Sequence, residues 1–330
     1  MKVSRFSRLI LMMIFIPFFA LYSYWLVVPT IYGDAASYQA LYDALSVANF
    51  DEIRRLGISF VSSREFTPYI IWIGARLGIE KDIYITFFNV ILLSGLLLFI
   101  LDRRISFSII FLAVLMVTNF YIVVLMTSAE RLKFAYVFLI LAAISKDRMK
   151  KILFIASIAM HFQSVLLVIG QLVYLYSGRL KQRLLSKGRS KNKKNIFRFF
   201  IFAVLGSVFL IYLKDGILIK AEGAIENSNS GIGELAQLFL LFIASIFLVH
   251  KNKFEICTMF LFYSLVILLI GGSRVNMIVY TSVVYIILSE GALNRFTVRA
   301  IPFFLIAIYL SFKSIGYIQR TFVQGHGWIL

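Results

Sequence analysis

Residues 156–170, ASIAMHFQSVLLVIG, place a histidine and a glutamine inside an otherwise apolar run. The whole chain of 330 residues contains only three histidines. An ionisable side chain in a membrane segment is costly unless it has a partner, so a histidine there indicates a functional position by default. How residues 152–176 enter or cross the membrane therefore decides the topology, and with it which charged residues share one face.

Composition favours a membrane protein over a soluble one. Hydrophobic residues make up 61% of the chain and charged residues 15%, with a mean hydropathy of +0.89, whereas about a quarter of a soluble domain is charged. We therefore predict an all-α polytopic membrane protein with about 9–11 transmembrane helices, forming a single membrane-embedded domain over residues 1–330. The predicted spans are 9–28, 84–101, 105–126, 131–145, 196–213, 233–250, 254–271, 275–290 and 299–315.

The net charge of +18 is concentrated beside a membrane segment. Nine basic residues fall between positions 179 and 198, and no acidic residue occurs from 148 to 214. Such a run is typical of a cytoplasmic loop, here residues 177–198, and of contact with anionic lipid headgroups. We therefore expect the lipid bilayer as a partner, and no nucleic acid. The single cysteine, Cys257, excludes an intramolecular disulfide.

The charge pattern predicts a membrane hairpin at the quoted stretch. Basic clusters at 146–151 and 179–198 both belong inside, so residues 152–176 must enter the membrane and return, with the tip near His161. This length suits two half-helices, which are tolerated only where they line protein or a wet cavity. The alternative is a single continuous span that places Ser157, His161, Ser164 and Gln171 on one helix face.

Two outer loops follow from this topology. Residues 30–67 start as an amphipathic helix, with Asp34, Tyr38 and Tyr42 spaced at i, i+4 and i+8. The second outer loop, residues 214–233, contains the polar run ENSNSGIG and is expected to be flexible.

A short apolar segment closes the first outer loop. Residues 68–79, PYIIWIGARLGI, are too short to cross a membrane comfortably. They indicate an interfacial or re-entrant helix that Pro68 opens and that ends near Gly78. With this helix, the first outer loop extends over residues 30–80.

Three arginines lie where predicted helices begin: Arg64, Arg131 and Arg274. A cation at this end opposes the helix macrodipole, at a cost of about 0.3–1 kcal/mol. Free backbone N–H groups beside an arginine fork instead make a good phosphate site. With the hairpin, all three arginines fall on the outer face, which indicates a pyrophosphate-bearing substrate. The alternative is that each arginine reaches to lipid headgroups or pairs locally.

The acidic residues have both structural and functional interpretations. Glu65 completes Ser62-x-x-Glu65 and Glu130 completes Thr127-x-x-Glu130, and both patterns match a capping box. Asp34 follows a glycine and precedes a helical pattern, so it is either an N-cap or a general base.

His161 is the most unusual candidate. It can transfer a proton or bind a ligand, and the neighbouring Gln163 and Ser164 can hydrogen-bond a sugar. The alternative is a histidine whose partners simply satisfy it in the interior. No second histidine or cysteine lies at ligand spacing, which argues against a metal site.

These residues, in this order, resemble the Wzy-type O-antigen polymerases and EpsG-like polysaccharide polymerases. The similar segments are YGDAASYQALYDAL (32–45), SREFTPYIIWIGARLG (63–78), SAERLKFAYVFLILAA (128–143), SIAMHFQSVLLV (157–168) and GGSRVNMIVY (271–280). Two departures concern the acids. Two residues separate Glu65 from Pro68, where the family has Glu-Pro, and a single Asp34 replaces the acidic pair often seen before the first tyrosine.

The resemblance implies a bacterial inner-membrane glycosyltransferase with a GT-C-like bundle and an active site that faces the periplasm. Such polymerases join oligosaccharide repeat units that are linked to undecaprenyl diphosphate, without a metal, nucleotide sugar or other cofactor. A chain-length regulator protein is an expected partner. Arg64, Arg131 and Arg274 would then bind the diphosphate, as the positions of the arginines suggest.

The same resemblance leaves the base open among Asp34, Glu65 and His161. Tyr38 and Gln163 are expected to contact substrate, and aromatic residues such as Tyr42 and Trp72 pack on sugar faces or anchor the chain at the membrane interface.

Two other functions compete with the polymerase. A membrane O-acyltransferase would also use His161 as a base, but from the cytoplasmic side. A transporter of lipid-linked glycans would show repeat symmetry and charges distributed through the midplane, and the sequence displays neither.

Overall fold

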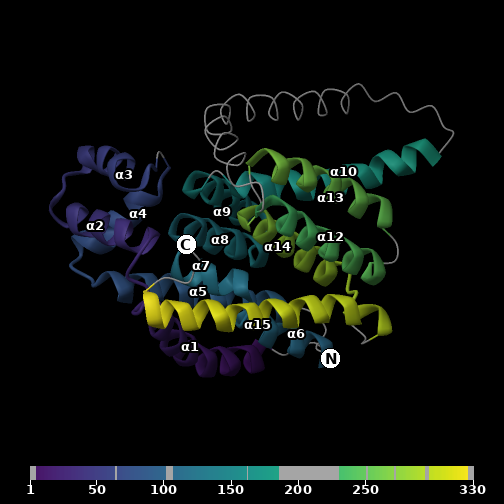
Figure 1. Cartoon of the computed structure of the whole chain (residues 1–330), viewed down its shortest axis with the longest axis horizontal. Helices are drawn as coiled ribbons and strands as arrows, with labels where there is room; N and C mark the ends of the chain where they lie inside the picture. The colour runs from purple at the N-terminus through teal and green to yellow at the C-terminus, as the bar shows by residue number, and fades with distance from the viewer. Residues whose placement is uncertain are drawn as a thin grey trace. The chain divides into compact units, whose positions relative to one another are not determined.

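The computed structural model describes residues 5–63, 65–101, 107–161, 163–185, 230–249, 252–270, 273–293 and 297–325. All regular structure in these ranges is helical, with no strand (Figure 1). The chain divides into two compact units, one of residues 1–166 with 288–330 and one of residues 167–287. Apolar helices occur in both units, and the single membrane-embedded domain remains a prediction.

The first unit contains most of the long helices. In chain order these elements are α1 (Arg5–Val27), α2 (Asp34–Val47), η1 (Phe50–Glu52), α3 (Ile53–Val61), α4 (Thr67–Arg76), α5 (Lys81–Leu101), α6 (Phe107–Val117), α7 (Phe120–Thr127), α8 (Glu130–Ile144), α9 (Asp147–Met160), η2 (Val298–Ala300) and α15 (Ile301–Gln324). The second unit contains most of α10 (Ser164–Leu185), followed by α12 (Ser230–Leu248), α13 (Lys253–Ile270) and α14 (Ser273–Ser289).

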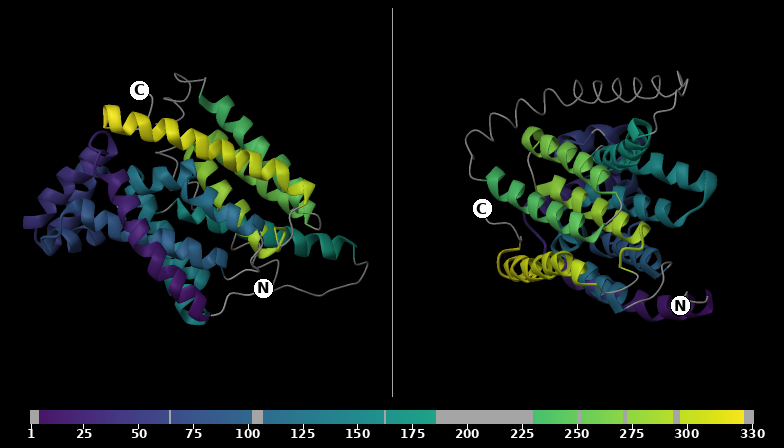
Figure 2. Two further views of the ribbon diagram at one scale, coloured as in Figure 1. Left: turned by 90° about the horizontal axis from the view of Figure 1, so that it is seen from below. Right: turned by 90° about the vertical axis from the view of Figure 1, so that its right-hand side faces the viewer.

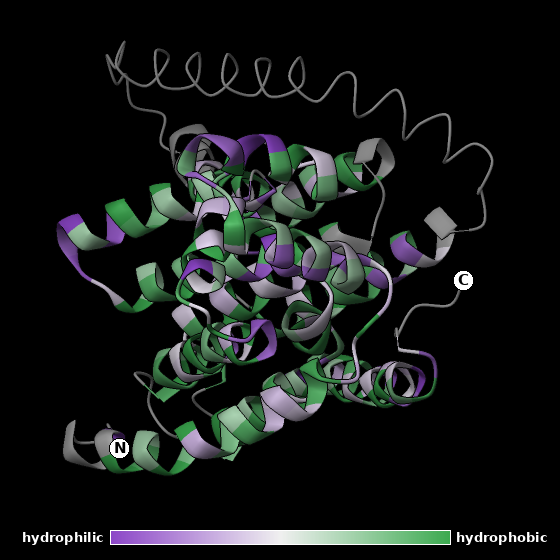
Figure 3. Cartoon of the chain, turned by 90° about the vertical axis from the view of Figure 1, so that its left-hand side faces the viewer, coloured by the Kyte–Doolittle hydropathy of each residue, from purple (hydrophilic) through white to green (hydrophobic). Residues whose placement is uncertain are grey.

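Four helical stretches are long and apolar enough to cross a membrane: Ile10–Val27, Lys81–Leu101, Phe107–Thr127 and Val298–Gln324. Hydrophobic residues cover most of the described helices (Figure 3). Large apolar side chains such as Leu21 and Phe312 are exposed on α1 and α15, which a bilayer would cover. The chain is therefore an all-α polytopic membrane protein. The number of crossings and the likeness to GT-C enzymes remain predictions.

Helices lie at the predicted spans wherever the structure describes them. Helix α15 continues to Gln324, well beyond the predicted end at residue 315. The predicted span 196–213 lies outside the described residues. So do most of the second outer loop and the C-terminal part of the basic loop.

One predicted span is interrupted. We expected residues 105–126 to form a single helix, but α6 ends at Val117 and α7 begins at Phe120. Asn119 explains the interruption, because its side chain accepts a hydrogen bond from the Tyr121 N–H at 2.9 Å and so caps α7. A short polar side chain that bonds the nearby backbone offers an alternative to the continuous helical ladder.

Helices α2, η1, α3 and α4 form an N-terminal lobe, defined here as residues 34–76, and are drawn together in Figure 1. The lobe has its own apolar core, in which Leu41, Leu45, Ile53 and Ile71 are buried. The same core includes Phe134 of α8, so apolar packing attaches the lobe to α8.

The short apolar segment folds as predicted. Pro68 lies in the first turn of α4, where its missing N–H costs nothing. The helix ends at Arg76, and Gly78 follows with a φ of +68°, a conformation that glycine adopts without strain. An interfacial or re-entrant position for this helix remains a prediction.

The quoted stretch breaks at its histidine. Helix α9 ends at Met160, α10 begins at Ser164, and His161 between them has an extended backbone with φ −155° and ψ 120°. The alternative of one continuous helix is therefore wrong. The two pieces are not equal half-helices, because α9 has 14 residues and α10 has 22. A return of the chain to the same side of the membrane remains a prediction.

The C-terminal helix lies along α6 and α7 and is the yellow helix of Figure 2. At its end, the Gly325 carbonyl accepts hydrogen bonds from the N–H groups of Ile31 and Tyr32 at 3.0 and 3.1 Å. A Cβ at Gly325 would meet the Tyr32 ring at 2.5 Å, so this close approach requires glycine. The end of α15 thus holds the segment that leads into Asp34.

Candidate active site

The segment before α4 is docked on the end of α9. The Phe66 N–H donates to the Ala159 carbonyl at 3.1 Å, and the Thr67 hydroxyl donates to the Met160 carbonyl at 2.7 Å. The last carbonyls of a helix have no intrahelical partners, so residues 66 and 67 satisfy two of them. This docking brings the preceding residue, Glu65, to the break at His161.

Glu65 and His161 form a hydrogen-bonded pair. The Glu65 Oε1 atom lies 2.8 Å from His161 Nδ1, and His161 is only 5% exposed. Ser164 stabilises the break that orients the ring, because its hydroxyl contacts the His161 carbonyl at 2.7 Å and the Ser157 carbonyl at 3.1 Å. The histidine is therefore held at its backbone and at its ring.

The second ring nitrogen has a partner that serves both protonation states. His161 Nε2 lies 3.0 Å from the side-chain oxygen of Gln163. A carboxylate only accepts, so Nδ1 donates its proton to Glu65. In the orientation shown, Nε2 donates to Gln163, whereas a rotated amide would instead donate to an unprotonated Nε2. The Gln163 amide can therefore hydrogen-bond Nε2 both when this nitrogen carries a proton and when it does not.

Arg131 supplies a cation next to this pair. It lies in the first turn of α8, as predicted, and its Nη1 atom is 4.0 Å from Glu65 Oε2. The Arg131 side chain is partly exposed, at 26%. The N–H groups at the start of α8 and this guanidinium together form a positive end at which an anion is favoured.

Tyr38 of α2 lies near these charges. It is buried and within electrostatic reach of Asp34, Glu65, Glu130 and Arg131. Burial raises the pKa of the Tyr38 hydroxyl above its ordinary value, so this group stays protonated at neutral pH. It is a hydrogen-bond donor in this neighbourhood and not a base.

Asp34 occupies a different helix position from the one predicted. Gly33 is the N-cap of α2, and Asp34 is the first helical residue. The positive end of the helix dipole stabilises a negative charge at this position. The expectation that Asp34 caps the helix is therefore wrong.

Neither predicted capping box forms. Ser62 closes α3 in a left-handed conformation with φ 50°, and α4 begins only at Thr67. Ser62 and Glu65 therefore do not share a helical turn, and the Glu65 carboxylate contacts His161 instead. A turn inserted between the two short helices explains this difference, because the box requires both residues in one helical turn.

At the start of α8, Ala129 is the N-cap and makes no side-chain cap bond. The Thr127 hydroxyl instead contacts the Val123 carbonyl at 2.9 Å. Glu130 forms a buried ion pair with Lys133, at 3.1 Å, in place of the predicted box.

Lys133 and Tyr317 join the neighbourhood without having been singled out from the sequence. The charged pair at i, i+3 in an apolar helix was a usable signal for Lys133. The Tyr317 hydroxyl lies 3.1 and 2.9 Å from the hydroxyls of Thr127 and Ser128, just before Arg131 in the chain. No local motif marks Tyr317, because α15 brings it from the far end of the sequence.

The side chains of the other two predicted arginines lie outside the described part of the chain. Arg64 lies outside the described residues. Arg274 is in the first turn of α14, as predicted, but it belongs to the second unit and its side chain is outside the described part. Their predicted role in diphosphate binding remains a prediction.

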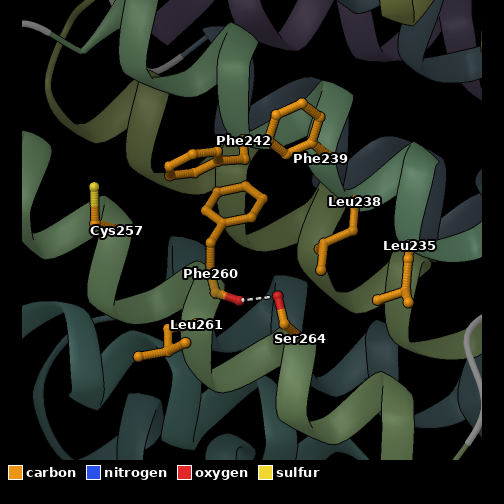
Figure 4. A pocket seen from close by; sticks show the side chains of 8 residues that line it. All are labelled: Leu235, Leu238, Phe239, Phe242, Cys257, Phe260, Leu261 and Ser264. Atoms are coloured by element: carbon orange, nitrogen blue, oxygen red, sulfur yellow. Dashed lines mark hydrogen bonds between the residues drawn. The ribbon is translucent and has the colours of Figure 1, made fainter.

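The second unit has a hollow of about 430 Å³ between α12 and α13. Phe239, Phe242 and Phe260 gather on one side of it, and Cys257 and Ser264 lie on α13 (Figure 4). The Ser264 hydroxyl bonds the Phe260 carbonyl of its own helix at 2.9 Å, so the lining is almost entirely apolar. Such a lining suits hydrocarbon.

The first unit therefore assembles an acid–base pair, a buried phenol and a partly exposed arginine from four separate segments. Among the described residues, no group of three or more His, Cys, Asp or Glu side chains could hold a metal ion. Comparison of the chain with protein-family models, with curated proteins and with solved structures found no match. The arrangement defines an all-α polytopic membrane protein with a site suited to proton transfer beside an anion.

Proposed function

We propose that this membrane protein is a glycosyltransferase of the polysaccharide-polymerase type, which joins oligosaccharide repeat units linked to a lipid diphosphate. The observation that carries the proposal is the 2.8 Å contact between His161 Nδ1 and Glu65 Oε1, with Arg131 beside the same carboxylate. A proton acceptor next to a cation suits a reaction in which a hydroxyl attacks and a diphosphate leaves.

His161 is the base in this proposal. Glu65 accepts the proton on Nδ1, which fixes the tautomer and stabilises the imidazolium that forms, as the carboxylate does in a Ser-His-Asp triad. With the Gln163 amide rotated so that its NH2 group donates to an unprotonated Nε2, this nitrogen takes the proton of an acceptor hydroxyl once Gln163 gives up its 3.0 Å contact. Asp34, at the exposed start of α2, is the competing base.

Arg131 stabilises the leaving group. The acceptor oxygen forms a bond to the anomeric carbon while the bond from that carbon to the diphosphate oxygen breaks, and the diphosphate keeps the electron pair. The acceptor proton goes to His161. Direct displacement inverts the anomeric centre, and the guanidinium with the N-terminus of α8 offsets the developing negative charge.

The arrangement also supports the likeness to Wzy-type and EpsG-like polymerases. Four of the five similar segments contribute to one neighbourhood, through Tyr38, Glu65, Arg131 and His161. Residues of these segments are far apart in sequence, so their meeting is not a consequence of local structure. The proposal accordingly includes a bacterial inner membrane, a periplasmic site, undecaprenyl diphosphate as the lipid carrier and a chain-length regulator as partner.

A surface-glycan gel from a deletion strain tests this function. We expect the deletion to leave single repeat units on the acceptor and the wild-type chain to restore the ladder of longer products. A normal ladder that has lost an acyl group would replace the proposal with an O-acyltransferase. Repeat units that accumulate on the cytoplasmic side of the membrane would replace it with a transporter.

A further inference from the structure

Four aromatic rings form a continuous row on the N-terminal lobe. Phe66 and Tyr69 have ring centroids 5.6 Å apart, Tyr69 and Phe50 are 5.4 Å apart, and Phe50 and Trp72 are 5.9 Å apart. Three of these residues follow each other at three-residue spacing along the start of α4, and Phe50 joins them from η1. We call this set the aromatic row.

The row is exposed yet rigidly supported. Phe66 is 57% exposed and Phe50 is 62% exposed, while Tyr69 and Trp72 are half-buried against the lobe core. The Trp72 indole N–H donates to the Ala48 carbonyl at 3.2 Å, which fixes the ring. A set of rings that is ordered before binding loses little conformational freedom when a ligand covers it.

The row begins at the candidate active site. Phe66 directly follows Glu65, and its N–H is bonded to the Ala159 carbonyl at the end of α9. The hydrogen bonds that place the Glu65 carboxylate against His161 therefore also place the first ring of the row. From Phe66 the rings lead away along the lobe to Trp72.

We propose that the aromatic row is a binding track for the oligosaccharide chain that enters or leaves this site, an inference that rests on the proposed function. A pyranose ring has an apolar face of C–H groups, which pack on the electron-rich faces of aromatic rings. Its hydroxyls point outward and need polar neighbours. Several successive rings suit a chain of sugars better than a single small molecule.

The surroundings of the row favour a glycan over the bilayer. Phe50 is followed by Asp51 and Glu52, and Arg54 and Arg55 are exposed on the next turn. Charged groups of both signs can hydrogen-bond sugar hydroxyls. Immersing the same groups in the apolar part of a bilayer would cost their hydration.

The test uses the full-length protein in lipid nanodiscs. The probes are lipid-free oligosaccharides of increasing repeat number, released from the surface glycan of the host strain. Binding is compared for a Phe50→Leu, Phe66→Leu variant, which keeps apolar bulk but removes two ring faces, and a Phe50→Tyr, Phe66→Tyr variant, which keeps the rings. Phe60→Leu, an exposed position on α3, is the matched control.

We expect affinity to rise with repeat number in the wild type, to fall about tenfold in the leucine variant and to be unchanged in the tyrosine and Phe60 variants. Equal affinity of the leucine variant and the wild type overturns the track. Quenching of Trp72 fluorescence by brominated lipids, with Trp25 and Trp328 replaced by phenylalanine, would show that the row is buried in the bilayer and also overturns it. The binding test needs no turnover. If Glu65→Gln abolishes polymer while the leucine variant binds normally, only the track fails.

Discussion

His161 Nδ1 lies 2.8 Å from Glu65 Oε1, although the two residues are 96 positions apart in the sequence. Neither residue belongs to the body of a helix: Glu65 lies in the turn between α3 and α4, and His161 lies between α9 and α10. Each side chain is brought to the other by backbone hydrogen bonds at the end of α9. The helices thus meet here through irregular segments of the chain.

Glu65→Gln is expected to reduce polymer formation about 10²- to 10⁴-fold. The amide can still accept from His161 Nδ1, but it carries no charge to stabilise the imidazolium. The measurement is the glycan ladder and the rate of repeat-unit addition at matched expression. Glu80→Gln is the control, because it removes an exposed carboxylate just before α5 to which the proposed reaction gives no role. A full ladder from Glu65→Gln would contradict the assigned role.

Arg131→Lys is expected to lower the rate of repeat-unit addition about 10²- to 10³-fold. Lysine keeps the charge but loses the planar fork that binds two phosphate oxygens at once. Arg148→Lys, at an exposed position in the first turn of α9, is the control and should retain the wild-type rate. If Arg131→Lys also has the wild-type rate, Arg131 does not hold the leaving group.

The buried pair of Glu130 and Lys133 should couple strongly in stability. Both side chains are almost fully buried, at 3% and 0% exposure. Lys133→Met alone leaves an uncompensated carboxylate and is expected to lower the free energy of unfolding by about 3–5 kcal/mol. A variant that combines Lys133→Met with Glu130→Gln should recover most of this loss. Thermal unfolding in detergent, followed by size-exclusion chromatography, measures the stability of the single and the double variant. If the double variant is less stable than the Lys133→Met variant, the two side chains do not stabilise the fold as a pair.

Tyr317→Phe is expected to lower stability by about 1–3 kcal/mol and to slow repeat-unit addition. The change removes the hydroxyl that contacts Thr127 and Ser128, and so loosens the turn that precedes Arg131. Tyr309→Phe, at an exposed position of the same helix, should behave as the wild type. Equal activity and stability of the two variants would show that α15 does not support the site.

Short-range signals predicted much of the fold. Pro68 and Gly78 set the ends of α4 closely, because proline suits a helix start and glycine accepts a positive φ. The positions of Arg131 and Arg274 in first turns were also correct. The tip predicted at His161 coincides with a break between helices, although it was inferred only from the distribution of positive charge.

The rest depended on contacts that no local pattern contains. Ser62-x-x-Glu65 matches a capping box, but the Glu65 carboxylate bonds His161, which directly follows the last residue of α9. Thr127 similarly bonds Tyr317, which lies beyond the predicted end of the last span. The sequence singled out Glu65, Arg131 and His161 as candidates, whereas tertiary packing decided that these three side chains meet.

The most direct measurement is a reaction of the purified protein in nanodiscs with repeat units linked to a polyprenyl diphosphate. Glycan length and released polyprenyl diphosphate are followed together, for the wild type and for His161→Gln. The account predicts that the wild type releases equal amounts of polyprenyl diphosphate and new linkages, and that His161→Gln forms neither at a comparable rate. Polymer formed by His161→Gln at the wild-type rate, or a wild type that makes no linkage, would contradict it.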